Sequence, residues 1–307
     1  MQRTTMYYTE GQFIGNQGLP LYYQYWQLHQ TPRAIVVLIH GLGSHSGLFF
    51  NIVDWLLPQG YIVYGFDLRG HGRSPGKRGH INSWDEFRGD VDRCFDHIAQ
   101  LEQRQSWSSN ADPLPRILVG HSLGGVIGLD YALRHPETLA GVVAIAPALG
   151  DVGIPPLKLT IGKALSKVWP RFSLSTGLGH DCASRDPAII EQYQCDPLRH
   201  TYGTARLATE FIHANKWIHH HAADLQCPLL ILHGLADQVA LAAGSDRFFQ
   251  NVALADKTRY EYDGAYHDLH NDINYPTVLQ DLSDWLERHL TNCPHLQPAS
   301  LAKHRST

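Results

Sequence analysis

The sequence predicts an α/β fold with a mostly parallel sheet of eight strands and helices on both faces. Short apolar runs rich in Val, Ile and Leu recur along the chain, which is typical of strands buried on both faces. Segments with helical spacing of apolar residues separate these runs. The alternation stops between residues 150 and 227, and this interruption indicates an insertion into a doubly wound sheet.

The elements follow from these patterns in chain order. Before residue 31, alternating apolar and polar residues around a Gly-rich break predict an antiparallel hairpin that starts the sheet. Buried parallel strands are expected at 34–39, 61–66, 117–119, 141–145 and 229–232, with a final strand at 258–262. Helices are expected at 48–57, 84–101, 122–134, 246–254 and 275–290.

The insertion is interpreted as a lid placed after the sixth strand. Prolines interrupt two helix-like segments, 157–169 and 205–222, and a ligand-binding edge of such a sheet lies beside the insertion. Its apolar residues could line an acyl pocket or contact lipid: Ile154, Leu157, Leu159, Ile161, Leu165, Val168 and Trp169. A pair of ordinary packing helices is the alternative. The expected division is core at 1–150, lid at 151–226, core at 227–292 and a loose tail at 293–307.

Composition narrows the class of function. The 307 residues are 43% hydrophobic and 18% charged with a net charge of −4, so nothing favours binding to nucleic acid. No run approaches the ~18 apolar residues of a membrane span, and the start does not look like a secretory signal, which predicts a cytoplasmic location. The five cysteines are scattered, as in a reducing compartment. The histidines at 219–221 are not expected to bind metal, because successive helical residues point in different directions.

The segment Gly120-His121-Ser122-Leu123-Gly124 carries the strongest chemical signal. It follows an apolar strand and leads into a helix, which is the arrangement of the nucleophile elbow of a serine hydrolase. The glycines permit a tight turn that exposes the hydroxyl of Ser122 at the edge of the sheet. A Gly-rich turn without chemistry is the alternative, so an acid and a base have to follow along the chain.

An acid and a base are present in the expected order. Asp237 comes just after the strand at 229–232. A serine hydroxyl needs a histidine as its base, and a carboxylate such as that of Asp237 orients the histidine. The alternative for Asp237 is a helix cap. His267 follows the final strand most closely and is the expected base, whereas His270 is the rival and more suited to lining the pocket.

Two backbone amides are the expected oxyanion donors. The loop after strand 34–39 reads His40-Gly41-Leu42-Gly43-Ser44-His45-Ser46-Gly47, and its glycines permit close approach of the backbone. The amide of Leu42, with that of Leu123 at the start of the helix, would stabilise the tetrahedral intermediate. A flexible turn without this role is the alternative.

Several motifs together resemble the monoacylglycerol lipase and lysophospholipase branch of the α/β-hydrolase superfamily, over about residues 12 to 290. They are His40 to Gly47, the stretches 65–74 and 76–80, Gly120 to Gly125, Ser184 to Pro187, Asp196 to Leu198, and Gly264 to His267. The resemblance implies a Ser122, Asp237 and His267 triad, Leu42 and Leu123 as oxyanion donors, and a mobile apolar cap that meets membranes. It favours a structural ion pair for Asp67 and Arg69.

Three positions bear on the head group of the substrate. Ser44 and Leu48 stand where the resemblance implies a glutamate and an arginine that order the polar end of the site. His270 matches a histidine near the glycerol end, so all three are expected to contact substrate. This departure leaves the preference for glycerol open.

The expected function is that of a serine ester hydrolase that cleaves a monoacyl lipid ester, with monoacylglycerol as the first candidate, through an acyl-enzyme. Lysophospholipase, medium-chain carboxylesterase and perhydrolase activities are alternatives. A hydrolase-fold protein that binds ligand without turnover is the alternative from another class. No metal or organic cofactor is expected, the lid is expected to contact membranes peripherally, and the sequence predicts no oligomeric state.

Overall fold

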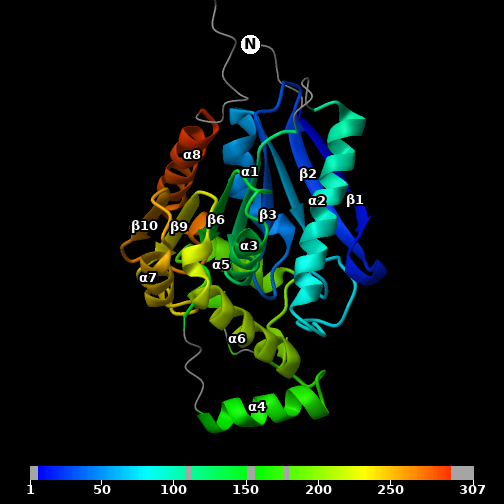
Figure 1. The fold of residues 1–307 in the computed structure, drawn as a ribbon, viewed down its shortest axis with the longest axis vertical. Coiled ribbons are helices and arrows are strands. Elements are labelled where there is room, and N and C mark those ends of the chain that lie inside the picture. Colours follow the sequence, from blue (N-terminus) through cyan, green and yellow to red (C-terminus); the bar gives the residue numbers. More distant parts are fainter. Residues whose placement is uncertain (1–5, 108–112, 151–155, 176, 178–179, 292–307) are drawn as a thin grey trace, which may run out of the picture.

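The chain forms a central sheet with helices on both faces (Figure 1). The structure, a computed structural model, describes residues 6–107, 113–150, 156–175, 177 and 180–291. Ile154 and the tail at 293–307 lie outside the described residues, as do the side chains of Leu157, Leu159 and Ile161.

The sheet has eight strands, as the sequence predicts. In spatial order they are β1 (Met6–Ile14), β2 (Pro20–Leu28), β4 (Tyr61–Phe66), β3 (Ala34–Ile39), β5 (Arg116–His121), β6 (Gly141–Ile145), β9 (Leu229–Gly234) and β10 (Lys257–Tyr262). The hairpin of β1 and β2 is antiparallel, and β2 is antiparallel to β4. Every other pairing is parallel, so the carboxyl ends of β3, β5, β6, β9 and β10 lie at one edge.

Side chains of the central strands alternate between two separate apolar layers. In β3, Ile35 and Val37 face one layer, whereas Val36 and Leu38 face the other, and all four are fully buried. Period-two alternation with both faces covered is what a continuous Val, Ile and Leu run produces in a parallel strand. Each such side chain contributes roughly 1.5–3 kcal/mol by its removal from water.

Helices cover the two faces unequally. α1 (Phe50–Leu56) and α8 (Tyr275–Thr291) contribute to one apolar layer. α2 (Asp85–Gln105), α3 (Leu123–Arg134), α6 (Ala205–His220) and α7 (Ala242–Asn251) contribute to the other. Short 3₁₀ turns are η1 (Asn16–Gly18), η2 (Ser46–Phe49), η3 (Leu57–Gln59), η4 (His180–Cys182), η5 (Ala222–Asp224) and η6 (Leu269–Asn271).

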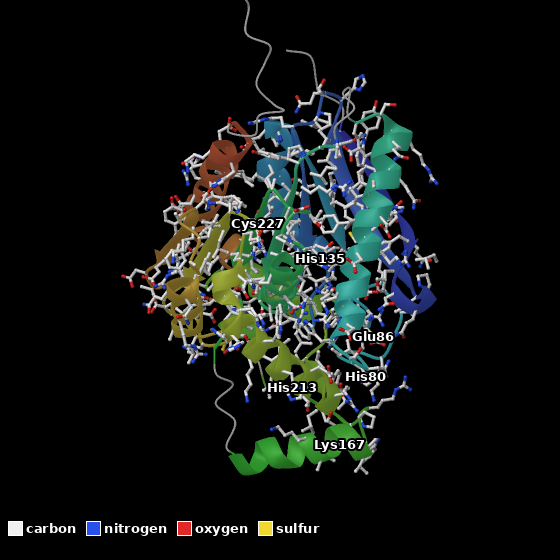
Figure 2. All side chains as sticks on the ribbon, in the orientation of Figure 1. His80, Glu86, His135, Lys167, His213 and Cys227 are labelled. Atoms are coloured by element: carbon white, nitrogen blue, oxygen red, sulfur yellow. The ribbon has the colours of Figure 1, made fainter. Side chains whose placement is uncertain are left out.

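The segment between β6 and β9 contains more structure than the sequence predicts. It holds α4 (Pro156–Val168), β7 (Ser173–Ser175), α5 (Pro187–Cys195), β8 (Tyr202–Thr204) and α6. α4 lies at the end of the long axis away from the sheet, with α6 between them, and Lys167 marks its place in Figure 2. The expected helices at 157–169 and 205–222 correspond to α4 and α6.

The start of α7 and the two short strands of the inserted segment differ from the elements that the sequence predicts. α7 begins at Ala242 rather than 246, because Leu241 is extended and two alanines, which are strong helix formers, start the helix. The strands β7 and β8 pair antiparallel over three residues each, too few for a detectable alternation in the sequence. Within the described ranges, no helix combines the length and apolarity that crossing a membrane requires.

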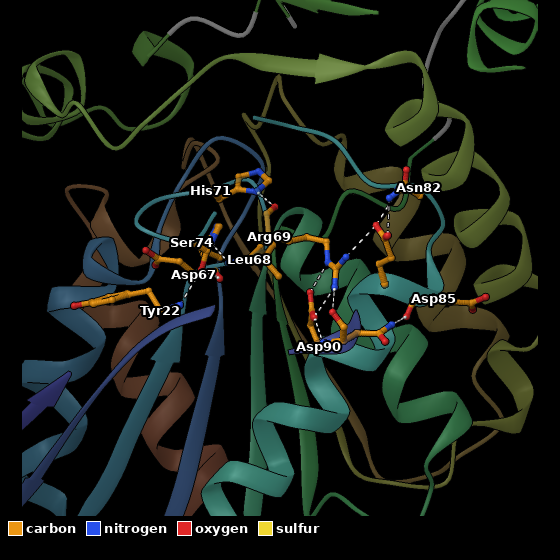
Figure 3. Close-up of polar contacts among 12 residues, drawn as sticks. Tyr22, Asp67, Leu68, Arg69, His71, Ser74, Asn82, Asp85 and Asp90 are labelled. Atoms are coloured by element: carbon orange, nitrogen blue, oxygen red, sulfur yellow. Dashed lines mark hydrogen bonds and ion pairs between the residues drawn. The ribbon is translucent and has the colours of Figure 1, made fainter. Parts of the chain in front are cut away.

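A buried ion cluster ties the loop after β4 to α2 (Figure 3). Arg69 donates two hydrogen bonds of 2.7 Å to the carboxylate of Asp90, and its third nitrogen lies 3.1 Å from Glu86. The amide of Asn16 also donates to Asp90, at 2.9 Å. The side chains of Arg69, Asp90 and Glu86 are 7%, 0% and 2% exposed. Because little water reaches these charges, each is stabilised mainly by the opposite charges beside it.

The expected pairing of Asp67 with Arg69 is wrong, although both residues are structural. Asp67 accepts hydrogen bonds from the amide and hydroxyl of Ser46, both at 2.7 Å, and from the amide of Arg73 at 2.8 Å. The two side chains are close in sequence but diverge, because Arg69 extends toward α2. Asp67 instead fixes the loop that follows β3.

Replacement of Asp90 by alanine tests the ion cluster. We expect Asp90→Ala to lower the free energy of unfolding by about 3–5 kcal/mol, because it leaves a buried guanidinium with one carboxylate fewer. Chemical denaturation measures the change. Asp96→Ala on the same helix is the control, since its pair with Arg93 is 60% exposed on both sides and should contribute less than about 1 kcal/mol. Equal effects of the two variants would contradict this account.

Candidate active site

Ser122 occupies a strained turn between β5 and α3. Its φ of 54° and ψ of −116° lie in a region that residues with a side chain rarely adopt. The positions on either side of this turn have room only for glycine, because a Cβ on Gly120 would lie 2.2 Å from the oxygen of Gly124. A Cβ on Gly124 would lie 2.0 Å from the oxygen of Ile39. The turn therefore presents Ser122 at the carboxyl end of β5.

Asp237 and His267 meet at the same edge of the sheet. Asp237 follows β9 and His267 follows β10, and Oδ2 of Asp237 accepts a 2.7 Å hydrogen bond from Nδ1 of His267. The other carboxylate oxygen accepts from the amides of Val239 and Ala240 at 2.8 and 2.9 Å. The orientations of the Asp237 carboxylate and of the His267 imidazole are thus fixed. Since Nδ1 of His267 carries a proton, Nε2 is left as the hydrogen-bond acceptor.

His233 also contacts the Asp237 carboxylate, which sequence reasoning missed. Nε2 of His233 donates to the oxygen of Ala240 at 2.7 Å and lies 3.3 Å from Oδ2 of Asp237. The hydroxyl of Ser245 donates to Nδ1 of His233 at 2.7 Å. The available sequence signal was a histidine four residues before Asp237, at the end of the strand that Asp237 follows.

The ionisation of the pair follows from burial and charge. Burial alone would raise the pKa of Asp237, but hydrogen bonds from His233 and His267 hold it well below its usual range. Burial alone would lower the pKa of His267, but the hydrogen bond to Asp237 and its charge raise the pKa above the usual value. Asp237 is therefore a carboxylate at neutral pH that stabilises a protonated His267.

His121 connects the turn at Ser122 to His267. Its ring lies 4.8 Å from the ring of His267 between centroids, and its Nε2 donates to the oxygen of His267 at 3.3 Å. The structure gives the hydroxyl of Ser122 no hydrogen bond within the described residues. Contacts between nucleophile and base commonly tighten only when substrate binds.

The loop after β3 lies against Ser122. Nε2 of His40 accepts from the amide of Leu68 at 2.9 Å, so its Nδ1 carries the proton and donates to the oxygen of Gly41 at 2.8 Å. A Cβ on Gly41 would lie 3.0 Å from Cβ of Ser122. In the part of the chain that the structure describes, the amides of Leu42 and Leu123 donate to no protein acceptor. Both are available to an oxyanion.

A second carboxylate, that of Asp268, lies close to His121 and His267. Its Oδ1 is 3.3 Å from Nε2 of His121, and burial lowers the pKa of His121 to about 3. Burial alone would raise the pKa of Asp268, but the facing histidines lower it. His121, His267 and Asp268 have potential metal-ligand atoms within 4.8 Å of one another. Nδ1 of His267 is bound to Asp237, and Nε2 of His121 lies 3.3 Å from both the backbone oxygen of His267 and Asp268, so protein contacts already occupy these nitrogens.

The three residues expected to contact substrate have different surroundings. Leu48 is 4% exposed and packs with Ala183, Ile189 and Tyr193 of the inserted segment. Ser44 is partly buried, and its amide donates to the oxygen of Gly41 at 3.2 Å.

His270 is 2% exposed, with its ring 5.1 Å from Phe49 and 4.9 Å from His121 between centroids. Its Nδ1 has no hydrogen-bond partner among the described residues, and burial lowers the pKa of the imidazole to about 4. The imidazole is therefore neutral, and its buried Nδ1 lacks a partner in the part of the chain that the structure describes.

Comparisons with known proteins agree with this geometry. A family described as serine aminopeptidase, S33, matches residues 30–274. Monoacylglycerol lipase of Mycolicibacterium smegmatis is 34% identical over 285 residues, covering 92% of this chain and 98% of that protein. Monoglyceride lipase of Homo sapiens is 28% identical over 280 residues, covering 90% and 89%. The crystal structure of Paleococcus ferrophilus monoacylglycerol lipase matches with a TM-score of 0.78 and 34% identity, covering 88% and 99%. The resemblance predicted from the motifs is confirmed.

Proposed function

This chain belongs to the family described as serine aminopeptidase, S33, and we propose that it is a serine hydrolase that cleaves monoacylglycerol to a fatty acid and glycerol. The observation that carries the proposal is the hydrogen bond between Asp237 and His267 at the strand edge where the turn between β5 and α3 places Ser122. The names of the M. smegmatis and human relatives support the choice of monoacylglycerol.

The proposed reaction has two halves with Ser122, His267 and Asp237 as the triad. The hydroxyl oxygen of Ser122 bonds to the ester carbonyl carbon while its proton passes to Nε2 of His267. The ester C–O bond then breaks, and the alcohol leaves with that proton. Water attacks the acyl-enzyme, gives its proton to His267, and releases the fatty acid as the proton returns to Ser122.

Leu42 and Leu123 are the proposed oxyanion donors. Gly41, next to Leu42, lies against Ser122, and Leu123 is the first residue of α3 directly after Ser122. Each amide would donate to the negative oxygen of the tetrahedral intermediate. The carboxylate of Asp237 stabilises the imidazolium that forms at the same moment. The chain's own groups thus balance both charges of the transition state.

We propose that the head group lies near Ser44 and His270. The unpaired nitrogen of buried His270 suits a glycerol hydroxyl. Leu48 packs into the apolar cluster with Tyr193. This packing favours a role for Leu48 in supporting the wall of the site, rather than in contacting a substrate hydroxyl. Lysophospholipids and medium-chain esters are the competing substrates, since Ser44 and Leu48 replace the charged residues that the resemblance implies.

The segment at 151–226 is proposed as a lid, with the core at 1–150 and 227–292. Val168 and Trp169 at the end of α4 are 86% and 60% exposed, and Leu174 of β7 and Tyr202 of β8 are also exposed. An apolar surface of this kind fits peripheral contact with a lipid surface. A cytoplasmic location stays a prediction.

A ligand-binding protein without turnover is the rival from another class. That reading gives no reason for the strained φ of Ser122 or for a buried carboxylate that fixes the tautomer of His267. Strain that persists at one serine favours chemistry at its hydroxyl.

Replacement of Ser122 tests the proposal. We expect Ser122→Ala to fold normally and to lose about 10⁶-fold in kcat on long-chain monoacylglycerol and p-nitrophenyl esters, because the nucleophile is removed. Fatty-acid release and labelling by a fluorophosphonate probe are the measurements. Turnover near that of the wild type would remove Ser122 from the mechanism. Failure of the folded wild type to take the label would favour the binding protein.

The pH profile tests the role of His267. The base must be neutral to accept the proton, and Asp237 raises its pKa. We therefore expect kcat/KM to fall on the acid side with a midpoint above ~6.5, the ordinary histidine value. Asp237→Asn should move that midpoint to lower pH, since it removes the charge of Asp237 and leaves burial opposed by the charge of Asp268, and should lower kcat by ~10⁴. A wild-type midpoint below the ordinary value would contradict this assignment.

A substrate panel tests the head group. We expect the highest kcat/KM for long-chain monoacylglycerols, compared with lysophospholipids and short esters of matched concentration. His270→Ala should lower kcat/KM for monoacylglycerol but leave that for a p-nitrophenyl ester largely unchanged, because the latter lacks glycerol hydroxyls. A uniform loss across the panel would assign His270 to packing instead.

A further inference from the structure

The loop at 40–47, which carries Leu42, is held from two sides. Core contacts hold its ends, through the hydrogen bond of His40 with the amide of Leu68 and through the bonds of Ser46 to Asp67. The middle of the loop contacts the inserted segment between β6 and β9. Leu42 lies between the core contact at one end and the contacts with the insert.

The first contact with the insert joins His45 to Asp196. Nδ1 of His45 accepts from the amide of Gly47 at 3.2 Å, so Nε2 carries the proton and donates to Oδ2 of Asp196 at 2.7 Å. The side chains are 10% and 14% exposed. Little water reaches this hydrogen bond, and its acceptor is ionised, which makes it stronger than a neutral surface contact.

Asp196 is fixed on its own side as well. Its Oδ1 accepts from the amide of Leu198 at 2.8 Å, which leaves Oδ2 for His45. Burial alone would raise the pKa of Asp196, but the hydrogen bond from His45 lowers it, so the carboxylate is charged at neutral pH. Each oxygen therefore has one assigned donor.

A second contact lies two residues earlier in the loop. The amide of His200 in the insert donates to the oxygen of Gly43 at 3.0 Å. The backbones are so close that a Cβ on Gly43 would lie 1.8 Å from the oxygen of His200, and Gly43 has a φ of 71°. The insert thus contacts the loop directly on the far side of Leu42 from His40.

We propose that Asp196 is a positioning residue, which acts through His45 to hold the loop at 40–47 so that the amide of Leu42 faces the oxyanion above Ser122. The inference rests on the proposed function, because it assigns a cause to the geometry of one oxyanion donor. It makes the inserted segment part of the machinery that stabilises the transition state, in addition to any part in covering the substrate.

The test replaces Asp196 with asparagine. The amide has nearly the same shape but offers one acceptor to two donors, the amide of Leu198 and Nε2 of His45. We expect kcat to fall about 10- to 100-fold, the effect of a donor displaced by about 1 Å, with KM changed less than about threefold. Thermal unfolding of the variant is measured in parallel.

A transition-state analogue separates positioning from packing. A long-chain alkyl trifluoromethyl ketone forms a hemiketal with Ser122 whose oxyanion meets the same donors. Its inhibition constant should rise by the factor by which kcat/KM falls. Binding of a non-hydrolysable alkyl glyceryl ether, which has no such oxyanion, should stay the same. A purely structural effect would weaken both ligands alike.

Two further variants serve as controls. Asp186→Asn changes a carboxylate of the same segment that caps α5 by accepting from the amide of Ala188 at 2.9 Å, and it should leave the kinetics unchanged. At position 45, His45→Gln keeps a donor that reaches Asp196, whereas His45→Asn keeps only the contact to Gly47. The glutamine variant should retain most of kcat and the asparagine variant should not.

The outcomes distinguish this inference from the proposed function. If the wild type neither hydrolyses esters nor takes the fluorophosphonate label, the proposed function fails. If the wild type is active and Asp196→Asn matches it in kcat and in ketone inhibition, the positioning role is wrong. Should Asp196→Asn not fold, the comparison of His45→Gln with His45→Asn decides, and equal kcat values in that pair would overturn the inference.

Discussion

The close packing of backbone around Ser122 is the constraint on which the rest of the site depends. Neither Gly120 nor Gly124 has room for one further carbon, because the start of α3 lies directly against β5 and the end of β3. That crossing forces the unusual φ of Ser122 and also brings Gly41 against it. The strained turn at Ser122 and the proximity of the loop at 40–47 are therefore two results of one contact.

Histidines partner three carboxylates of low exposure around this edge. Asp237 pairs with His267, Asp268 with His121, and Asp196 with His45. A buried carboxylate without a donor would cost several kcal/mol, and a neutral imidazole supplies that donor without adding a permanent positive charge. Burial keeps the pKa of His121 near 3, so the negative charges of Asp237 and Asp268 act on His267 with little compensation. This excess of negative charge favours the protonated form of His267.

The sheet and the order of the chemical residues could be predicted from the sequence, because buried parallel strands have a distinct composition and their ends converge. The expected proximity of Asp237 and His267 agrees with their hydrogen bond, while their catalytic roles stay predictions.

The partners within loops could not be predicted. His45 meets Asp196 across 151 residues of chain, and no local pattern encodes that contact. The same reason explains the wrong pairing for Arg69, whose carboxylates lie on a helix that packs against it from elsewhere in the sequence.

The eight-stranded sheet is open at both ends, since β1 and β10 each have one neighbouring strand among the described residues. An incoming strand from another molecule would find unpaired backbone groups there, which is the usual route to aggregation. β10 alternates Lys257, Arg259 and Glu261, and β1 has Glu10 near its centre. A strand that docked at either end would have to approach these ionic side chains and their partners, so the few charged residues act as gatekeepers against self-association through the backbone.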